Sequence, residues 1–542
     1  MDKKSLLFIS SVLLGSFFTV NAKKKERKPN ILFIMSDDHT SQAIGIYGGR
    51  LASLNPTPNI DRIGEEGIVF ENAFCTNSIC SPSRASIMTG QYSQTNGVLD
   101  LVGRLSPENQ YLPQEMKRNG YQTAIVGKWH LRDKPEAFDY YNVFHGQGRY
   151  FDPVLYEKGS DEKVSKRDCG LIWMRVDSLP GHKYYGHSSD IVTDLSLDWL
   201  ENKRDKSRPF ILMHHFKAPH DLFEFNPKYK DYLAEKFIPE PASMYYDSNH
   251  GSIATKGEVG KLLDTIGSSV GKRNIIRNMG MHMEIDSTLS DQEYKHQAYQ
   301  EYLKRYLRCV KGVDDNVKRL LDYLEVNDLL DNTIIIYTGD QGFNLGEHDY
   351  IDKRWMYEES MRMPFLVRYP KIITPNTRTD AIINNTDFAP TIIDIAGGEI
   401  PEEMQGHSFK EILESGKEPQ NWQQETYYRY WMHMAHNHGN PAHLGIRTKR
   451  YKLILFYGKD YTVRGGMNPN KYQLMTRLQT PVAWELYDLQ EDPMEMNNCY
   501  DDPKYQEVVV QLKDRLRNKR KELNEEDAKY PELERIIENN WN

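Results

Sequence analysis

The sequence has few cysteines and no long apolar segment beyond its N-terminus. Only five cysteines occur in 542 residues, which excludes a dense disulfide framework, and an odd number leaves at least one thiol without a partner. Cys80 is the candidate for that thiol. No stretch after residue 22 is long and apolar enough to cross a bilayer, so we expect no integral membrane span.

The chain also lacks an excess of basic residues and any internal repeat. Lys and Arg number 69 against 77 Asp and Glu, and the formal net charge is -8. This balance argues against a protein that coats nucleic acid, so we expect no nucleic-acid partner. An anionic substrate must therefore be held by a local cluster of cations.

The N-terminus has the pattern of a secretory signal peptide. Lys3 and Lys4 precede an apolar run from Leu6 to Val20, and Val20-Asn21-Ala22 is a small-residue cleavage pattern. We therefore expect residues 1–22 to be a signal peptide and the protein to be periplasmic or secreted. No cysteine follows before Cys75, so a bacterial lipid anchor has no attachment site.

Apolar runs that each end in polar residues predict the fold of the main domain. The runs cover residues 30–35, 123–126, 210–213 and 333–337. Continuous runs of this kind suit strands that are buried on both faces of a parallel sheet. Helical patterns lie between them. Thr57 is predicted to cap a short helix that starts at Pro58 and runs to Glu66, and a second helix is predicted over 299–325. The sequence therefore predicts an α/β sandwich around a central, mostly parallel sheet.

The polarity of the chain changes towards its C-terminus. Residues 397–424 are polar, shorter alternating segments such as 451–456 follow, and a charged helix is expected over 507–524. We predict a main domain over 23–410 and a smaller α+β subdomain with an antiparallel sheet over 411–542. Residues 239–292 are irregular and rich in glycine, and we interpret them as a long surface insertion.

Oxygen-bearing side chains follow two of the predicted strands. Asp37 and Asp38 end one run, and Asp340 and Gln341 end another. In open α/β sheets the site lies beyond the carboxyl ends of the strands, so these groups are expected to meet there. Converging carboxylates need a cation between them, and oxygen ligands favour Ca²⁺ or Mg²⁺ over zinc. As an alternative, Asp37 and Asp38 cap a following helix.

Cationic side chains lie in the same strand-end loops or at helix starts. They are Arg84, Lys128, His130, His220 and Lys353. A tetrahedral oxyanion needs donors of this kind around it. The alternative is ordinary surface charge, which is favoured for Lys353 taken alone. For Gly127-Lys128-Trp129-His130 it is not favoured, because a merely solvated lysine seldom stands beside a tryptophan.

Several short motifs resemble the type I sulfatase family. Cys80-Ser81-Pro82-Ser83-Arg84, followed by Thr89-Gly90, is similar to its signature C-x-P-S-R-x-x-x-x-T-G, and Gly127-Lys128-Trp129-His130 is similar to the second signature. Further similar stretches are 57–61, 339–342, 387–391 and 485–489. The resemblance spans nearly all of the predicted mature chain, and it implies an alkaline-phosphatase-like fold.

The resemblance also implies a chemistry for Cys80. In this family the signature cysteine is oxidised by a formylglycine-generating enzyme to Cα-formylglycine, whose hydrated form attacks sulfur. Ser81-Pro82 can start a helix, which would place residue 80 at a helix N-terminus, where anionic charge is favoured.

The family's residue roles carry over onto matching positions. Asp37, Asp38, Asp340 and Gln341 would bind one Ca²⁺ together with residue 80, and Arg84 would hold the formylglycine and the metal site. Lys128 and Lys353 would bind sulfate, His130 would deprotonate the geminal diol, and His220 would protonate the leaving alcohol.

The stretch 351–360 is similar to glycosaminoglycan and mucin sulfatases, above all to N-acetylglucosamine-6-sulfatases. Asp352 and Arg354 flank Lys353, and they either bind sugar hydroxyls or form an ion pair that fixes the loop. The histidine-rich stretch 431–438 fits no closed zinc site, and a polar loop facing the sugar is favoured. His443 is a further candidate for contact with the sugar.

We expect an exo-acting carbohydrate sulfatase that removes the 6-O-sulfate of N-acetylglucosamine in mucin O-glycans or glycosaminoglycan fragments. One alternative is a sulfatase for 6-O-sulfo-N-acetylgalactosamine or N-sulfoglucosamine. Another is a phosphomonoester or phosphonate hydrolase of the same superfamily. A non-catalytic glycan-binding protein would need a broken site, whereas every expected polar position is filled.

Overall fold

The computed structural model describes residues 27–169, 176–245, 249–257, 262, 265–273, 275–461, 479–525 and 527–542. The predicted signal peptide, residues 1–22, lies outside this part. Among the described helices, none has both the length and the apolar character that a membrane span needs. All five cysteines are free and buried, so Cys80 is unpaired as expected, and so are the other four.

An 11-stranded sheet forms the centre of the molecule, in the order β14-β2-β15-β11-β1-β9-β3-β4-β5-β8, with β16 paired to β2. The five middle strands run parallel: β11 (Thr333–Gly339), β1 (Asn30–Ser36), β9 (Phe210–His215), β3 (Gln122–Gly127) and β4 (Tyr140–Phe144). The four predicted strands are thus confirmed, and they are neighbours. The flanks add antiparallel pairs through β2 (Ile68–Phe74), β14 (Arg362–Met363), β15 (Phe365–Arg368), β5 (Val154–Glu157) and β8 (His182–Lys183), whereas β16 (Thr377–Asn384) is parallel to β2.

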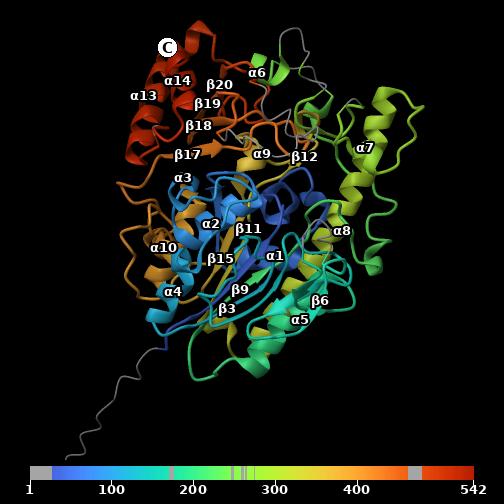
Figure 1. The fold of residues 1–542 in the computed structure, drawn as a ribbon, viewed down its shortest axis with the longest axis vertical. Helices are drawn as coiled ribbons and strands as arrows, with labels where there is room; N and C mark the ends of the chain where they lie inside the picture. The colour runs from blue at the N-terminus through green and yellow to red at the C-terminus, as the bar shows by residue number, and fades with distance from the viewer. Residues whose placement is uncertain are drawn as a thin grey trace, which may run out of the picture.

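Both faces of the sheet are covered, which explains why its strands are continuously apolar. Along β1, Ile31 and Phe33 enter one core, and Leu32 and Ile34 enter the other. Helices α2 (Cys80–Thr89), α4 (Tyr111–Arg118) and α10 (Phe388–Ile395) cover the first face, and α5 (Ser188–Asp198) and α8 (Asp291–Val326) cover the second (Figure 1).

Helix α8 is longer than predicted. One of its carboxylates also contacts the start of the neighbouring helix α1 (Pro58–Glu65). Thr57 was expected to cap α1, but its hydroxyl donates to Asp61 instead. Oδ1 of Asp314, on α8, accepts from the backbone amides of Asn59 and Ile60, each at 2.9 Å. A carboxylate from a distant helix therefore caps α1.

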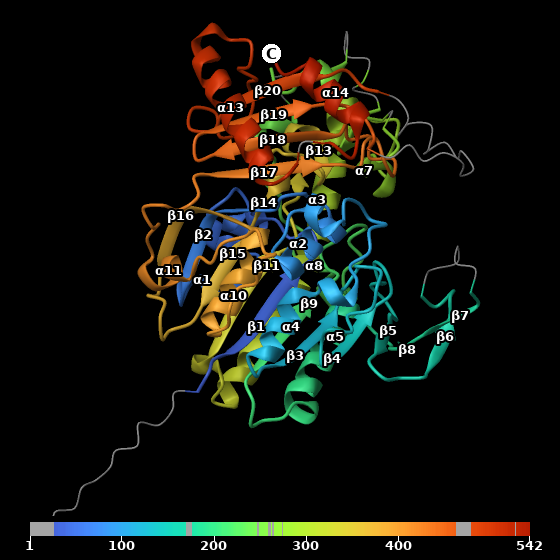
Figure 2. The ribbon, with the colours of Figure 1, turned by 60° about the vertical axis from the view of Figure 1, so that its left-hand side comes forward.

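The C-terminal part lies at one end of the large sheet (Figure 2). Its antiparallel sheet has the order β17 (Glu425–Tyr430), β18 (His443–Thr448), β19 (Tyr451–Phe456) and β20 (Ala483–Asp488). Helix α13 (Gln506–Glu522) matches the predicted charged helix, and α14 (Pro531–Asn539) was not predicted. Helix α11 (Lys410–Ser415) packs Ile412 into the core of the main domain, so the predicted boundary after residue 410 falls within this helix, after its first residue.

The sheet of the C-terminal part has two different faces. On β18, Leu444 and Ile446 pack in a separate core with the C-terminal helices. His443 and Arg447 point the other way, onto the loop 355–358 of the main domain. The subdomain therefore supports the loop that follows Lys353.

The segment 239–292 was interpreted as a surface insertion, and its described residues correct this. Strand β10 (Ser268–Ser269) pairs with β13 (Tyr350–Asp352), whose last residue precedes Lys353. Ser269 and Met279 are completely buried. The segment therefore packs against the loops that carry the predicted site.

Candidate active site

The predicted site residues meet at the carboxyl ends of the central strands. The register pairs Ser36 with Gly339, and His215 with both Met35 and Gly127. The residues that follow these positions are therefore neighbours, although they are up to about 300 positions apart in the chain.

Three carboxylates form a buried cluster at this edge. Asp37, Asp38 and Asp340 are fully buried, and one oxygen of each lies within 4.8 Å of the others. Nε2 of Gln341 donates to Oδ1 of Asp38 at 2.5 Å, whereas its Oε1 is buried without a hydrogen-bond partner. Oxygen donors with an unsatisfied amide carbonyl among them fit a hard divalent cation.

Each of these carboxylates is paired with a predicted sulfate-binding or site-holding cation. Nζ of Lys353 lies 2.5 Å and 2.6 Å from the two carboxylate oxygens of Asp38. Lys128 pairs with Asp37, and Nη2 of Arg84 lies 2.9 Å from Oδ2 of Asp340. The cations and the carboxylates thus form one compact, buried network.

Burial and neighbouring opposite charges shift the pKa values of this network in opposite directions. Burial raises the pKa of Asp38 to about 7, although the Lys353 ammonium lowers it. Burial would also raise the pKa of Asp340, but Arg84 and Lys128 outweigh it and hold that pKa below its usual value. Burial lowers the pKa of Lys128 well below that of an exposed lysine. A bound divalent cation would compensate the desolvation of the carboxylates.

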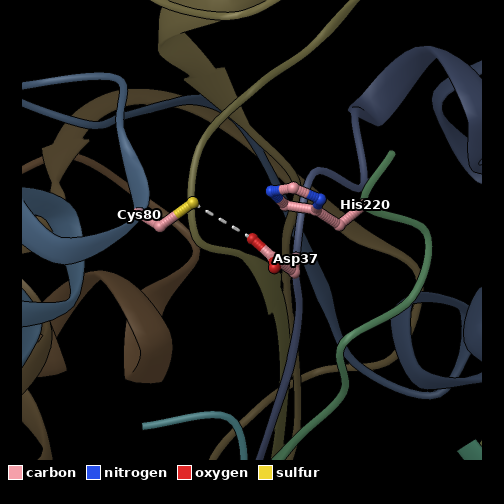
Figure 3. Close-up of side chains that lie close together, drawn as sticks. All are labelled: Asp37, Cys80 and His220. Atoms are coloured by element: carbon pink, nitrogen blue, oxygen red, sulfur yellow. Dashed lines mark hydrogen bonds between the residues drawn. The ribbon is translucent and has the colours of Figure 1, made fainter. Parts of the chain in front are cut away.

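Cys80 is the first residue of α2, after Ile79 in extended conformation. Its thiol donates to Oδ1 of Asp37 at 3.4 Å, and His220 lies on the other side of Asp37 (Figure 3). Burial raises the pKa of the Cys80 thiol to about 12, so the unmodified side chain is a protonated, weak nucleophile at neutral pH. The hydroxyl of Ser81 donates to the carbonyl of His130 at 2.7 Å, which ties the second motif to the start of α2.

His220 has its own carboxylate partner, the adjacent residue Asp221, which was not among the predicted site residues. Its Nδ1 lies 2.6 Å from Oδ1 of Asp221, and its Nε2 lies 3.8 Å from Oδ2 of Asp38. Arg277 pairs with the other carboxylate oxygen of Asp221. Burial lowers the pKa of His220 to about 3, with Lys353 acting in the same direction and Asp221 against it. The imidazole is therefore neutral before an anionic substrate enters.

These side chains open onto a small cavity of about 160 Å³. It is lined by Ile79, Cys80, Leu101, Gln147, His220, Asp221, Arg277, Asp352, Lys353, Arg354, His436 and His438. Five predicted site residues are in this lining. Arg84 and Lys128 are buried outside it, and His130 is 9% exposed with an unpartnered Nδ1.

Asp352 and Arg354 flank Lys353, and both line the cavity. Oδ2 of Asp352 lies 2.5 Å from Nδ1 of His438 and 3.9 Å from Nε of Arg354. Arg354 donates to the hydroxyl of Tyr430 at 3.1 Å, and its Nε is buried with no hydrogen-bond partner. The ion pair that fixes the loop is therefore present, and both side chains still face the cavity.

The structure does not bring His443 to the cavity, which corrects that expectation. The residue is completely buried, its ring stacks on Tyr428 and Trp355, and its Nδ1 lies 2.7 Å from the carbonyl oxygen of Pro441. His443 faces the back of the loop that carries Lys353, because its β18 face packs against that loop. Two histidines of the polar loop before β18, His436 and His438, line the cavity beside His220.

Three further polar lining residues were missed. Gln147 accepts from Nζ of Lys128 at 2.6 Å, and Asp221 and Arg277 form the contacts described above. Only Asp221 had a signal in the sequence, its position beside His220. The others come from irregular loops whose place in the fold no periodicity predicts.

Two family models match the chain. The model "Sulfatase" matches residues 29–398, and "N-sulphoglucosamine sulphohydrolase, C-terminal" matches 346–464 and 459–522. An N-acetylglucosamine-6-O-sulfatase of Bacteroides thetaiotaomicron is 36% identical over 558 residues, covering 96% of this chain and 92% of the relative. An N-acetylglucosamine-6-sulfatase of Capra hircus is 30% identical over 438 residues, covering 77% and 69%.

A solved structure has a similar fold over nearly the whole chain. It contains a protein in complex with its substrate, D-glucosamine-2-N,6-O-disulfate. The two chains superpose with a TM-score of 0.75 at 35% identity, and the match covers 92% of this chain and 99% of the other.

Proposed function

This chain belongs to the sulfatase family and is a sulfuric ester hydrolase, and we propose that it is exo-acting and removes the 6-O-sulfate of N-acetylglucosamine. The observation that supports this proposal is that Lys353, the proposed sulfate ligand, lines the cavity together with Asp352 and Arg354 on either side of it in the chain. Relatives named as N-acetylglucosamine-6-sulfatases and a neighbour that holds a glucosamine disulfate support this choice. The source would be glycosaminoglycan fragments or mucin O-glycans.

Sulfatases carry a formylglycine and a metal ion, and we propose that Cys80 is the modified residue and that the ion is Ca²⁺. The oxygens of Asp37, Asp38, Asp340 and Gln341, with residue 80, would hold the ion, which would supply positive charge beside the sulfate. Oxidation of Cys80 by a formylglycine-generating enzyme would replace an inert thiol by a hydrated aldehyde, whose hydroxyl is the nucleophile. Arg84 would hold this residue and the carboxylates in register.

The other side chains would bind the sulfate and move protons. Lys353 and Lys128 bind its oxygens and offset the charge that develops in the transition state. His220 donates a proton from Nε2 to the bridging ester oxygen as the S–O bond breaks, which lets the sugar leave as an alcohol. His130 accepts the proton of the second hydroxyl at residue 80 when sulfate is expelled.

Sulfate release from defined sugars tests the proposal. The full chain, produced with a formylglycine-generating enzyme and supplied with calcium, is given 6-O-sulfo-N-acetylglucosamine, N-sulfoglucosamine and N-acetylglucosamine 6-phosphate in separate assays. We expect sulfate from the first, with a kcat/KM above those of the other two. Faster phosphate release would support a phosphomonoesterase instead, and turnover of N-sulfoglucosamine alone would move the reaction to the amino group.

We also propose export, from the signal-peptide pattern of residues 1–22. The mature protein would lie in the periplasm or outside the cell. Mass spectrometry of the N-terminal peptide tests this, because cleavage after Ala22 would leave Lys23 as the first residue. An N-terminus that still starts at Met1 in the exported fraction would contradict it.

A further inference from the structure

We infer that Asp221 is a positioning residue that orients His220 for proton transfer to the leaving alcohol, with Arg277 holding Asp221 in place. The inference rests on the acid role of His220 in the proposed function. It depends on the contacts of three adjacent side chains, not on which sugar carries the sulfate.

The carboxylate of Asp221 fixes which nitrogen of His220 faces the reaction. Nδ1 of His220 lies 2.6 Å from Oδ1 of Asp221 and 2.8 Å from its carbonyl oxygen. With two acceptors beside it, Nδ1 carries a proton, so Nε2 is left for the substrate. Nε2 lies 3.8 Å from Oδ2 of Asp38, and Figure 3 shows one ring nitrogen on the side of Cys80 and Asp37. The ring is therefore held with Nε2 towards the metal cluster.

The same carboxylate also favours the charged form of the ring that the acid step requires. His220 donates the Nε2 proton to the ester oxygen, the S–O bonding pair goes to that oxygen, and the imidazole returns to neutral. The ring takes up this proton from solvent once the anionic sulfate has bound, and the adjacent carboxylate of Asp221 keeps the imidazolium oriented through its Nδ1–H.

Arg277 holds the Asp221 carboxylate in place. It pairs with Oδ2 of Asp221, so the two oxygens of this carboxylate have separate partners. The carbonyl of Arg277 accepts from the amide of Ser269 at 3.1 Å, and Ser269 pairs with Tyr350 on β13. Arg277 is thus anchored to the strand that leads into Asp352 and Lys353, and Asp221 is held between this anchor and the acid.

Two other roles for Asp221 make different predictions. Among the described residues, Asp221 does not belong to the clusters of side chains that are spaced closely enough to share a metal ion. It does line the cavity, so direct contact with the sugar is the competing role. Loss of a sugar contact would mainly raise KM. Loss of an orienting contact would lower kcat, and only in enzyme that still has His220.

A double-mutant cycle on His220→Ala and Asp221→Asn tests the inference. The cycle is run under steady-state conditions on whichever sugar sulfate the wild-type enzyme hydrolyses best. We expect Asp221→Asn alone to lower kcat about 10- to 1000-fold with KM changed less than about 3-fold. In the His220→Ala background the same change should alter the rate less than about 2-fold.

Asp194→Asn is the matched control, because Asp194 also pairs with an arginine, Arg319, but on the surface. This variant should keep the wild-type rate. The inference would be overturned if the rate losses of the two single variants multiplied in the double mutant. It would also be overturned if Asp221→Asn raised KM and left kcat unchanged. A wild-type enzyme that prefers another sugar would contradict the proposed substrate and leave the cycle unaffected, so the two failures are distinguishable.

Discussion

The thiol of Cys80 lies 3.4 Å from a carboxylate oxygen of Asp37. One residue starts helix α2 and the other follows strand β1, so the sheet topology brings a modifiable side chain to the edge of a metal-type cluster. A nucleophile generated at residue 80 would therefore arise beside the ion that activates it. Most of the predictions below depend on this relationship.

Replacing Cys80 by alanine should abolish sulfate release. Alanine lacks the thiol whose oxidation gives the aldehyde, and loss of one buried sulfur atom leaves little empty space. The free energy of unfolding of the variant should lie within about 1 kcal/mol of the wild-type value. Sulfate release at the wild-type rate would contradict the mechanism, and loss of the cooperative unfolding transition would show a structural role instead.

Replacing Asp352 by alanine should lower kcat/KM for the sugar sulfate roughly 10- to 1000-fold, because hydrogen bonds to the sugar are lost. Activity on an aryl sulfate, which has no such hydroxyls, should fall much less. Asp380→Ala is a suitable control, since this exposed carboxylate also pairs with a lysine, Lys449. An unchanged kcat/KM for the sugar would place the specificity elsewhere.

Replacing His220 by alanine should slow poor leaving groups most. A sugar alkoxide needs a proton as it departs, whereas 4-nitrophenolate leaves without one. The ratio of kcat/KM for 4-nitrophenyl sulfate to that for the sugar sulfate should therefore rise about 10-fold or more. If both substrates lose the same factor, His220 acts on the sulfate and not on the leaving oxygen.

Removal of the divalent cation should inactivate and destabilise the enzyme. Asp37, Asp38 and Asp340 would be left buried with less positive charge between them. After treatment with a chelator, activity should vanish, the Tm should fall by several degrees, and added Ca²⁺ should restore both. Full activity of protein shown to be metal-free by mass spectrometry would contradict the metal site.

Acid should destabilise the fold through buried histidines such as His214. Burial lowers the pKa of His214 to about 3, with Arg319 adding to the shift, whereas an unfolded histidine titrates near about 6.5. Between these values the unfolded state holds the extra proton, so this stability is present above about pH 6.5 and is lost as the pH falls towards 3.

The His214→Gln variant measures this contribution. Its free energy of unfolding should depend less steeply on pH between 4 and 6, by about 1.4 kcal/mol per pH unit. Denaturant unfolding of both proteins across this range gives the two slopes. Equal slopes would mean that His214 is not held neutral in the fold.

The central strands and their polar ends were predictable because parallel strands buried on both faces show a plain apolar pattern. Asp37 and Asp340 follow such strands directly, so the meeting of their carboxylates was expected. The pairing order of the strands was not predictable, nor was the cap that Asp314 supplies to α1, because these depend on contacts between distant segments. Thr57 has the sequence of an N-cap, but this long-range contact replaces it.

The catalytic end of the cavity was more predictable than its walls. Arg277 and His438 come from irregular loops, where side-chain direction follows no period. His443 begins β18, and alternation along that strand turns it towards Trp355, behind the loop of Lys353. Its position in the sequence is near the site, but the strand face on which it lies is known only from the fold.

The most direct test of the substrate is the rate of sulfate release from 6-O-sulfo-N-acetylglucosamine beside 6-O-sulfo-N-acetylgalactosamine, measured with calcium on formylglycine-bearing enzyme. The two sugars differ only in the configuration of the 4-hydroxyl, a group with which Asp352 and Arg354 can form hydrogen bonds. The proposed function predicts a kcat/KM for the first sugar at least about 10-fold higher. Equal rates, or preference for the second sugar, would contradict it.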